Sequence, residues 1–270
     1  MKKFLQFTAG ILVALTLVTI FWLRDVIFVD EPMLTDWTVQ LEPHVYTRVL
    51  GEEPRPVVFL MHGCGGQKPW LREQRLERYS QWGYFAVAID SFGARDVDPK
   101  RVCEGTQLWA GQRLIDLAAA LEIVSNNPLA DTSRYAVVGF SHGAWAALET
   151  YSDSWDEYES MVGAPSAVVA YYPFCEWPNR AAASWKRNTP LLSLLGELDS
   201  ITAVTPCLEL FNRNALTTVI RHVVYPGAEH GFDVLNTEEW TDHYNEDADV
   251  SAQREVKQFL DSQFSQGRSN

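Results

Sequence analysis

The sequence predicts an α/β fold with a mostly parallel central sheet flanked by helices. Over residues 37–265, apolar runs rich in β-branched and aromatic residues alternate with longer helical patterns, which is typical of strands joined by crossover helices. The runs are continuously apolar, as expected for strands buried on both faces. No linker divides these residues, and α/β domains of this length commonly remain undivided, so a single domain is expected.

The strands and helices alternate along the chain. Helices are expected to end near Gly, Asn or Pro, where helices commonly stop. The expected strands are an outer one at 45–50 and six buried ones at 57–61, 84–89, 135–140, 167–172, 191–195 and 219–225. The expected helices are at 70–81, 107–125, 142–151, 204–214 and 252–264.

The composition argues against a nucleic-acid-binding protein and excludes a disordered one. The chain has 35 Asp plus Glu against 22 Lys plus Arg, a formal net charge of −13 at pH 7. No basic stretch reverses this balance locally, so nucleic acid is not an expected partner, and a neutral or cationic substrate fits better than a polyanion. With 47% hydrophobic residues and 10 Trp, the chain can form a sizeable core, which excludes a disordered protein.

The N-terminal segment differs from the rest. Residues 4–23 carry no charge and lie between Lys2 and Lys3 on one side and Arg24 and Asp25 on the other. As a helix rising about 1.5 Å per residue, this stretch is long enough to cross a bilayer core of roughly 30 Å. A buried core helix would need burial on every side. A cleaved signal peptide would have a shorter apolar region ending in small residues, whereas this one ends in Phe-Trp-Leu.

The sequence therefore favours an uncleaved signal anchor, a transmembrane helix within residues 1–25. The two lysines before it place the N-terminus in the cytoplasm. We expect a single-pass membrane protein with its folded domain in the periplasm or the extracellular space, in contact with the membrane through this helix; protein partners are unknown. The expected organisation is an anchor at 1–25, a linker at 26–36, the α/β domain at 37–265 and a tail at 266–270.

Four cysteines in such a compartment can form two disulfides, and the sequence permits three pairings. Cys64 with Cys103, and Cys175 with Cys207, are preferred, because each pair joins segments that leave neighbouring strands of the expected sheet. Ordinary buried thiols are the alternative. No C-x-x-C spacing or Cys/His cluster is present, so no metal site is expected.

Ser141 is the candidate nucleophile. It is the centre of the Gly-Phe-Ser-His-Gly sequence at 139–143, between an expected strand and an expected helix. In that context a G-x-S-x-G turn strains the serine and exposes its Oγ, while the glycines leave room for the backbone. A small-residue turn with a surface serine is the weaker interpretation. Cys64 lacks this context and is rejected as nucleophile.

A serine hydroxyl needs a base to take its proton, and the base needs a carboxylate to orient it. Asp199 follows the apolar run at 191–195, and His230 follows the run at 219–225. Parallel strands would bring these strand exits to one edge of the sheet. Glu197 is the competing acid. His230 combines the chain order Ser, Asp, His with a place in a loop directly after a strand. The other candidate bases do not combine the two; they are His62, His142, His222 and His243.

A glycine-rich loop, His-Gly-Cys-Gly-Gly at 62–66, follows the apolar run at 57–61. A loop in this position donates one backbone N–H to an oxyanion hole, and the residue after the nucleophile donates the other. The predicted oxyanion-hole donors are therefore the main-chain N–H groups of Cys64 and His142. A loop used only for connection is the alternative. A phosphate-binding loop fits less well, since neither a Walker lysine nor GxGxxG is present.

Taken together, these motifs resemble the dienelactone hydrolase family of the α/β-hydrolase superfamily, as a serine-nucleophile variant. The resemblance implies an α/β-hydrolase fold, hydrolysis of small esters or lactones, and no cofactor. The motifs that carry it are His-Gly-Cys-Gly-Gly at 62–66, Asp-Ser-Phe-Gly at 90–93, Val-Gly-Phe-Ser-His-Gly at 138–143, Leu-Gly-Glu-Leu-Asp at 195–199 and Pro-Gly-Ala-Glu-His-Gly-Phe at 226–232.

Two departures from the family narrow the expected substrate. The namesake enzymes use a cysteine nucleophile where this chain has Ser141, and an arginine that holds a substrate carboxylate where this chain has Val234. Dienelactone itself is therefore not expected. Aromatic residues near the strand exits can line an apolar pocket or belong to the core; they are Trp109, Tyr172, Phe174 and Trp177.

The sequence thus predicts a serine hydrolase that cleaves a carboxylic ester or lactone through an acyl-enzyme intermediate. A peptidase or acyltransferase would use the same triad with another pocket or acceptor. From a different class, a catalytically silent, membrane-tethered binding module is the remaining alternative.

Overall fold

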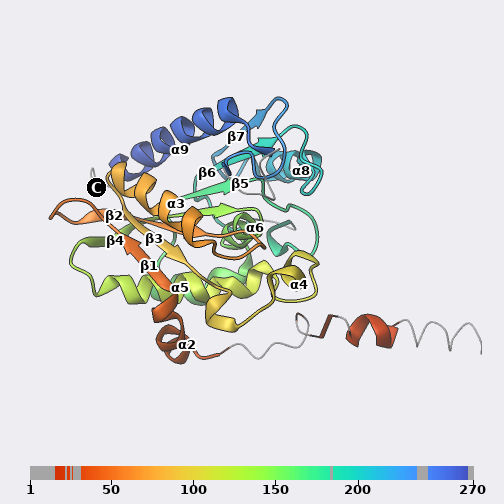
Figure 1. The fold of residues 1–270 in the computed structure, drawn as a ribbon, viewed down its shortest axis with the longest axis horizontal. Coiled ribbons are helices and arrows are strands. Elements are labelled where there is room, and N and C mark those ends of the chain that lie inside the picture. The colour runs from red at the N-terminus through yellow and green to blue at the C-terminus, as the bar shows by residue number, and fades with distance from the viewer. Residues whose placement is uncertain are drawn as a thin grey trace, which may run out of the picture.

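The computed structural model describes residues 16–21, 23–24, 26, 32–182, 185–235 and 243–266. These residues form one seven-stranded sheet in the order β1-β3-β2-β4-β5-β6-β7 (Figure 1). β1 pairs antiparallel with β3, and all other neighbours pair in parallel, so the expected mostly parallel sheet is confirmed. The strands are β1 (Val45–Arg48), β2 (Arg55–Met61), β3 (Phe85–Ile89), β4 (Ala130–Phe140), β5 (Ala167–Tyr171), β6 (Leu191–Gly196) and β7 (Ile220–Tyr225).

The continuous apolar runs place the central strands between two cores. Along β2, Val57 and Phe59 face one core and Val58 and Leu60 face the other, because successive side chains of a strand point to opposite faces. β3, β5 and β6 are buried along their whole length. Burial on both faces explains why these strands lack the polar alternation of a half-exposed sheet.

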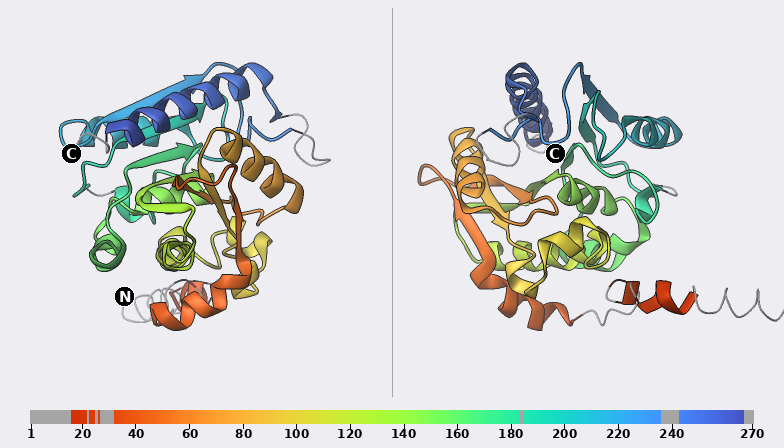
Figure 2. Two further views of the ribbon diagram at one scale, coloured as in Figure 1. Left: turned by 90° about the vertical axis from the view of Figure 1, so that its left-hand side faces the viewer. Right: turned by 45° about the vertical axis from the view of Figure 1, so that its right-hand side comes forward.

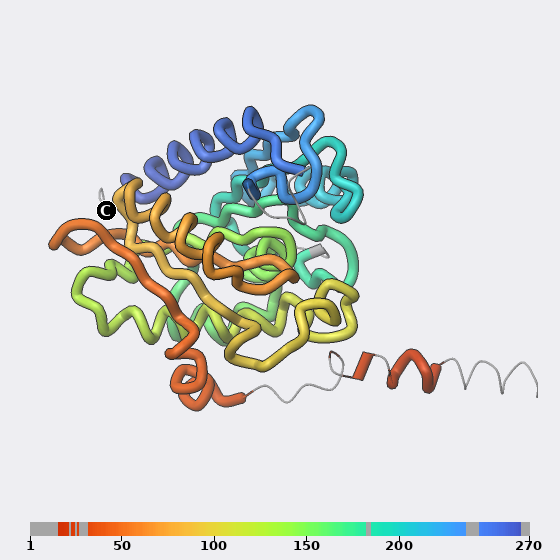
Figure 3. Tube along the Cα trace, in the orientation of Figure 1, coloured from red at the N-terminus to blue at the C-terminus, as the bar shows by residue number. Residues whose placement is uncertain are grey.

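Helices cover both faces of the sheet (Figure 2). α3 (Pro69–Gln81) and α9 (Glu246–Gln266) pack on one core, and α9, the last helix of the described residues, is the dark blue coil at the end of the tube in Figure 3. The helices that contribute to the other core are α2 (Leu34–Leu41), α5 (Leu114–Ser125), α6 (His142–Glu149), α7 (Asp156–Val162) and α8 (Val204–Asn214). A short α4 (Pro99–Cys103) and the 3-10 segments Glu42–His44, Gly93–Arg95, Ala110–Arg113, Asp153–Trp155 and Arg180–Ala182 connect these elements.

Several boundaries differ from the sequence-based expectation. The helix expected over 107–125 begins only at Leu114, because Leu108 has a left-handed φ of +51° and a 3-10 turn precedes the helix. α2 was not expected. It begins at Leu34, inside the stretch interpreted as a linker, and is stabilised by burial of Trp37 and Leu41 in the core shared with α5. The short α4 and α7 were also not expected.

Within the described residues, no helix is long and apolar enough to cross a membrane. Most of the predicted span at 4–23, together with the last four residues of the predicted tail, lies outside the described residues. The signal anchor and the topology derived from it therefore stay predictions.

Both preferred disulfides are present. Cys64 on the loop after β2 is bonded to Cys103 at the end of α4, and Cys175 after β5 is bonded to Cys207 on α8. Cys103 is exposed and Cys64 half-buried, whereas the other pair is buried. All four cysteines are paired, so the alternative of buried thiols is wrong.

Candidate active site

The strand-turn-helix around Ser141 has the strained geometry that its sequence predicts. β4 ends at Phe140 and α6 begins at His142, and Ser141 between them has φ +55° and ψ −117°. Its backbone N–H donates to the carbonyl of Tyr171 at 3.0 Å. A non-glycine residue with positive φ is held there by its surroundings at an energetic cost, and such strain is typical of functional sites.

The two glycines of the turn permit close backbone contacts. A Cβ added to Gly139 would lie 2.1 Å from the carbonyl oxygen of Gly143, and one added to Gly143 would lie 2.0 Å from that of Met61. Both distances are far shorter than any real Cβ contact. The sequence therefore needs glycine here so that the turn can sit against the end of β2.

The three residues predicted as a triad are hydrogen-bonded in series. Ser141 Oγ lies 2.8 Å from Nε2 of His230, and Nδ1 of His230 lies 2.8 Å from Oδ2 of Asp199. They follow β4, β7 and β6 respectively, and the parallel strands bring these ends to one edge of the sheet. Asp199 and His230 are buried, with 8% and 6% of their surface exposed.

The loop after β6 holds Asp199 in place. Its Oδ1 accepts the backbone N–H groups of Ile201 and Thr202 at 2.9 and 2.8 Å, and its Oδ2 accepts the Thr202 hydroxyl at 2.9 Å. Burial alone would raise the pKa of Asp199, but the hydrogen bond and charge of His230 and these N–H donors outweigh it and lower the pKa. Asp199 is therefore a carboxylate at neutral pH, ready to stabilise an imidazolium.

Glu197, the competing acid, has another contact. It is exposed, and its Oε2 accepts the backbone N–H of Gly227 at 3.0 Å. This bond ties the loop after β6 to the loop after β7. Glu197 thus supports the arrangement of the two loops, while Asp199 contacts His230.

The glycine-rich loop lies against Ser141. A Cβ on Gly63 would be 3.4 Å from Cβ of Ser141 and 3.9 Å from its Oγ. Cys64 follows directly in the loop, and His142 follows Ser141 as the first residue of α6. Both segments predicted to supply oxyanion-hole N–H groups therefore adjoin Ser141.

His142 itself is a buried structural group. Its Nδ1 lies 3.1 Å from a guanidinium nitrogen of Arg113, and its Nε2 donates to the carbonyl of Leu108 at 3.0 Å. Burial, reinforced by the charge of Arg113, lowers the pKa of His142 to about 3. Burial likewise lowers the pKa of His62 well below its usual value. Both imidazoles are neutral at pH 7, and His62 packs edge-on against Phe92.

Because His62 and His142 are buried as neutral imidazoles, we expect the folded protein to lose stability in mild acid. The pKa of His142 is about 3 in the folded protein and about 6.5 in an unfolded chain, so the unfolded chain binds more protons between these values. The stabilisation is complete above pH 6.5 and is lost as the pH falls, by about 1.4 kcal/mol per pH unit for each such histidine. Urea denaturation between pH 7 and pH 4.5 measures this slope.

His142→Gln provides the matched test, since an amide can still accept from Arg113 and donate to Leu108 without titrating. We expect it to flatten the pH dependence of the free energy of unfolding. His222→Gln, at an exposed position on β7, should leave the slope as it is. An unchanged slope in His142→Gln would show that His142 does not control acid stability.

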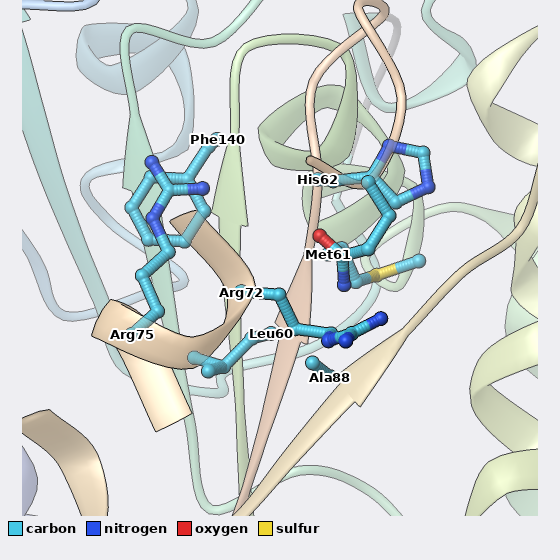
Figure 4. Close-up of a pocket in the computed structure, with 8 residues that line it drawn as sticks. Leu60, Met61, His62, Arg72, Arg75, Ala88 and Phe140 are labelled. Atoms are coloured by element: carbon cyan, nitrogen blue, oxygen red, sulfur yellow. The ribbon is translucent and has the colours of Figure 1, made fainter. Parts of the chain in front are cut away.

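A buried ionic cluster lies beside the loop that carries His230. Arg75 on α3 pairs with Asp233 at 3.0 Å, and its guanidinium lies over the ring of Phe140, 3.2 Å from the centroid (Figure 4). Asp233 also accepts the hydroxyl of Tyr172 at 2.5 Å, and the Tyr172 ring lies 4.6 Å from that of His230.

The pocket shown in Figure 4 is lined by Leu60, Met61, His62, Gln67, Arg72, Arg75, Ala88 and Phe140.

The predicted pocket aromatics divide into two groups. Tyr172 is 3% exposed and its ring lies 4.6 Å from that of His230 between centroids, so it leaves almost no surface for a substrate. Trp177 is 78% exposed and contacts Trp109 edge-on at 5.7 Å between centroids. Phe174 packs at 5.3 Å from Trp145, whose ring lies 5.3 Å from that of His142. Three of the four residues therefore stay candidates for a pocket wall.

Sequence reasoning missed the supporting residues. A signal existed for Thr202, because an Asp followed by Ser-Ile-Thr is typical of a loop in which the acid accepts neighbouring N–H groups. A signal existed for Arg113 too: it directly precedes 114–121, a stretch that is apolar except for Asp116, and so enters the core with it. Arg75 gave none, since it is one charge among many on α3. Among the described residues, no group of His, Cys, Asp and Glu could hold a metal ion.

Comparison with known proteins supports the family expected from the motifs. The profile of the dienelactone hydrolase family matches residues 45–264. A curated relative is the non-reducing polyketide synthase stbA of Stachybotrys bisbyi, 30% identical over 129 residues. That match covers 44% of this chain and 5% of the synthase, so this chain corresponds to only a small part of its relative.

Solved structures share the fold. A protein described as a dienelactone hydrolase from Klebsiella pneumoniae has a TM-score of 0.65 and 20% identity, covering 80% of this chain and 91% of its own. The dienelactone hydrolase-like promiscuous phosphotriesterase P91, from metagenomic libraries, has a TM-score of 0.57 and 15% identity. That match covers 81% of this chain and 98% of P91. Propionate-bound esterase 2 of Thermogutta terrifontis has a TM-score of 0.59 and 15% identity. That match covers 79% of this chain and 88% of the esterase. At these identities the likeness shows the α/β-hydrolase-like fold alone.

Proposed function

The chain belongs to the dienelactone hydrolase family, and on that premise we propose that it is a serine hydrolase that cleaves a carboxylic ester or lactone through an acyl-enzyme intermediate. The observation that carries this proposal is the unbroken hydrogen-bonded series from Ser141 through His230 to Asp199. The strained backbone of Ser141, which presents its hydroxyl to this series, supports it.

The proposed reaction follows from these contacts. His230 takes the proton of the Ser141 hydroxyl as Oγ attacks the ester carbonyl, and Asp199 stabilises the imidazolium that forms. The main-chain N–H groups of Cys64 and His142 stabilise the oxyanion. His230 then gives the proton to the departing alcohol oxygen. Water, deprotonated by His230, attacks the acyl-serine. When the second oxyanion collapses, the bond from the acyl carbon to Oγ breaks, the acid leaves, and His230 gives its proton to Oγ of Ser141.

The substrate is proposed to be a small ester without negative charge. The net charge of −13 disfavours polyanions, and Val234 stands where the namesake enzymes carry an arginine for a substrate carboxylate. Trp109, Phe174 and Trp177 supply apolar surface for its acyl or alcohol group. That esterase 2 of Thermogutta terrifontis binds propionate and butyrate makes short acyl groups a suitable first choice.

The test uses the full-length chain and a fluorophosphonate probe. We expect covalent labelling that peptide mapping assigns to Ser141, together with hydrolysis of short-chain p-nitrophenyl esters that declines as acyl length or negative charge increases. A folded protein that neither labels nor hydrolyses esters would instead support the binding module. Labelling at Ser141 with turnover of peptides or acyl transfer alone would support the peptidase or acyltransferase.

Replacing the two candidate acids distinguishes their roles. Asp199→Asn should lower kcat by about 10³-fold or more, since the amide favours the wrong tautomer of His230 and cannot stabilise its charge. Glu197→Gln, which keeps an oxygen to accept the N–H of Gly227, should stay within about threefold of the wild type because an exposed loop contact contributes little. The rate of ester hydrolysis per folded molecule is measured for both variants. A large loss in Glu197→Gln with a near wild-type rate in Asp199→Asn would assign the role of the triad acid to Glu197.

The location of the domain is a separate proposal. We infer a signal anchor with a cytoplasmic N-terminus and the hydrolase domain on the outer side. The two disulfides support it, because such bonds persist in oxidising compartments. Protease added to sealed right-side-out vesicles should digest the domain; complete protection would place the domain on the other side.

A further inference from the structure

Arg113 is a fully buried guanidinium beside the candidate active site. It lies at the end of the 3-10 segment Ala110–Arg113, directly before α5, and none of its surface is exposed. Keeping a charge away from water is costly unless its contacts compensate.

One terminal nitrogen of Arg113 contacts both segments that flank the nucleophile. Its Nη1 donates to the carbonyl oxygen of His62 at 2.8 Å and lies 3.1 Å from Nδ1 of His142. His62 begins the glycine-rich loop that carries Cys64, and His142 follows Ser141. The Nε of Arg113 donates to the hydroxyl of Ser91 at 3.0 Å, which anchors the guanidinium to the loop after β3.

These bonds determine the orientation of the His142 ring. Arg113 has no acceptor atom, so Nδ1 of His142 must accept and Nε2 must carry the proton, which it donates to the carbonyl of Leu108 at 3.0 Å. Burial lowers the pKa of Arg113 to about 10, and the guanidinium is still charged at neutral pH. The ring is thus held at both nitrogens, and the first residue of α6 is held with it.

The glycine-rich loop is likewise held at two points. Arg113 holds the carbonyl of His62 at its start, and the disulfide to Cys103 holds the side chain of Cys64. Oxyanion donors are effective when they are in place before charge develops on the substrate. A glycine-rich loop provides little stiffness of its own, so external contacts must supply it.

We propose that Arg113 is a positioning residue that holds the two halves of the oxyanion hole, the Cys64 loop and the His142 turn, in register. The proposal rests on the proposed function. Arg113 need not touch the substrate. Its loss would lower transition-state stabilisation and leave ground-state binding of the ester largely unchanged, because the hole binds charge that appears only during the reaction.

The test compares Arg113→Met and Arg113→Lys with the wild type in the full-length chain. Titration with the fluorophosphonate probe, taken to completion, counts competent sites, and kcat is expressed per titrated site so that partial unfolding does not affect it. We expect kcat per site to fall about 100-fold in Arg113→Met and at least about tenfold in Arg113→Lys, as when an oxyanion donor is lost. KM should stay within about threefold.

A trifluoromethyl ketone, which binds as a tetrahedral adduct, gives a second readout. Its affinity should fall in parallel with kcat/KM across the variants. Arg187→Met is the matched control: Arg187 is also largely buried and bonds to Glu159 and to the carbonyl of Ser152, away from both segments. It should lose stability while keeping its rate per site.

A structural role alone would give a different pattern. Fewer titratable sites with an unchanged kcat per site in Arg113→Met would overturn the proposal; should that variant fail to fold, wild-type kcat per site in Arg113→Lys would do so. Wild-type protein that neither labels nor hydrolyses esters would overturn the proposed function, and this inference with it. A change in KM at constant kcat would assign Arg113 to substrate binding instead.

Discussion

Replacing Ser141 with alanine is expected to lower kcat for ester hydrolysis by about 10⁴-fold or more, since the nucleophile and its base act as a unit. The fold should persist, because the backbone N–H of Ser141 still reaches the carbonyl of Tyr171, and the side-chain hydrogen bond that is lost joins Ser141 to His230 alone. Steady-state rates and fluorophosphonate labelling measure the loss. A rate near that of the wild type would overturn Ser141 as nucleophile.

Ser141→Gly is the informative companion. Glycine adopts a φ of +55° without the steric cost that a side chain has there, and relief of such strain is worth on the order of 1 kcal/mol. We therefore expect a variant that is as inactive as Ser141→Ala but more stable than it in urea denaturation. Lower stability than Ser141→Ala would show that the turn is not strained.

Gly143→Ala is expected to destabilise the folded protein by at least about 3 kcal/mol, since overpacking against the backbone forces elements apart. The added Cβ would lie 2.0 Å from the carbonyl oxygen of Met61 and 2.6 Å from that of His62. Met61 ends the central strand β2 and His62 follows it directly, so these atoms cannot move without disturbing the sheet. Helix propensity alone would make this change stabilising, because it favours alanine over glycine by about 1 kcal/mol inside a helix. The expected change in the free energy of unfolding has the opposite sign.

The control for Gly143→Ala is in the glycine-rich loop. A Cβ on Gly65 meets nothing within 4 Å, and its φ lies outside the left-handed range, so Gly65→Ala should change stability by less than about 0.5 kcal/mol. Soluble yield and urea midpoints compare the two. A Gly143→Ala protein as stable as the wild type would mean that the turn can move away from β2.

Local sequence was enough to predict the strands and the order of the site residues. Central strands are buried on both faces and therefore read as continuous apolar runs, and the strained turn leaves its trace in the spacing of Gly139, Ser141 and Gly143. Helix beginnings were predicted less well. The region 107–113 has helical composition, but Leu108 takes a left-handed φ and its carbonyl accepts from His142, a contact between residues far apart in the chain.

Side-chain roles were harder to predict than their positions. Tyr172 lies near the exit of β5 as expected, yet its ring packs against that of His230 and its hydroxyl donates to Asp233. Nothing within ten residues of Tyr172 indicates this, because Asp233 comes from the loop after β7. Glu197 and Asp199 could not be separated by composition either; their different hydrogen bonds, to Gly227 and to His230, separated them.

By itself, the sequence determined the fold class and the order of the site motifs, because each depends on periodicity or on motifs confined to a few consecutive residues. Its choices of Asp199 over Glu197, and of one disulfide pairing among three, were preferences. Tertiary structure alone decided which buried charges hold the site together. Arg113 and Arg75 acquire their roles from partners that the sheet brings from distant segments. A hydrogen bond is directional and short-ranged, so residue type and spacing cannot specify its partner until the chain has folded.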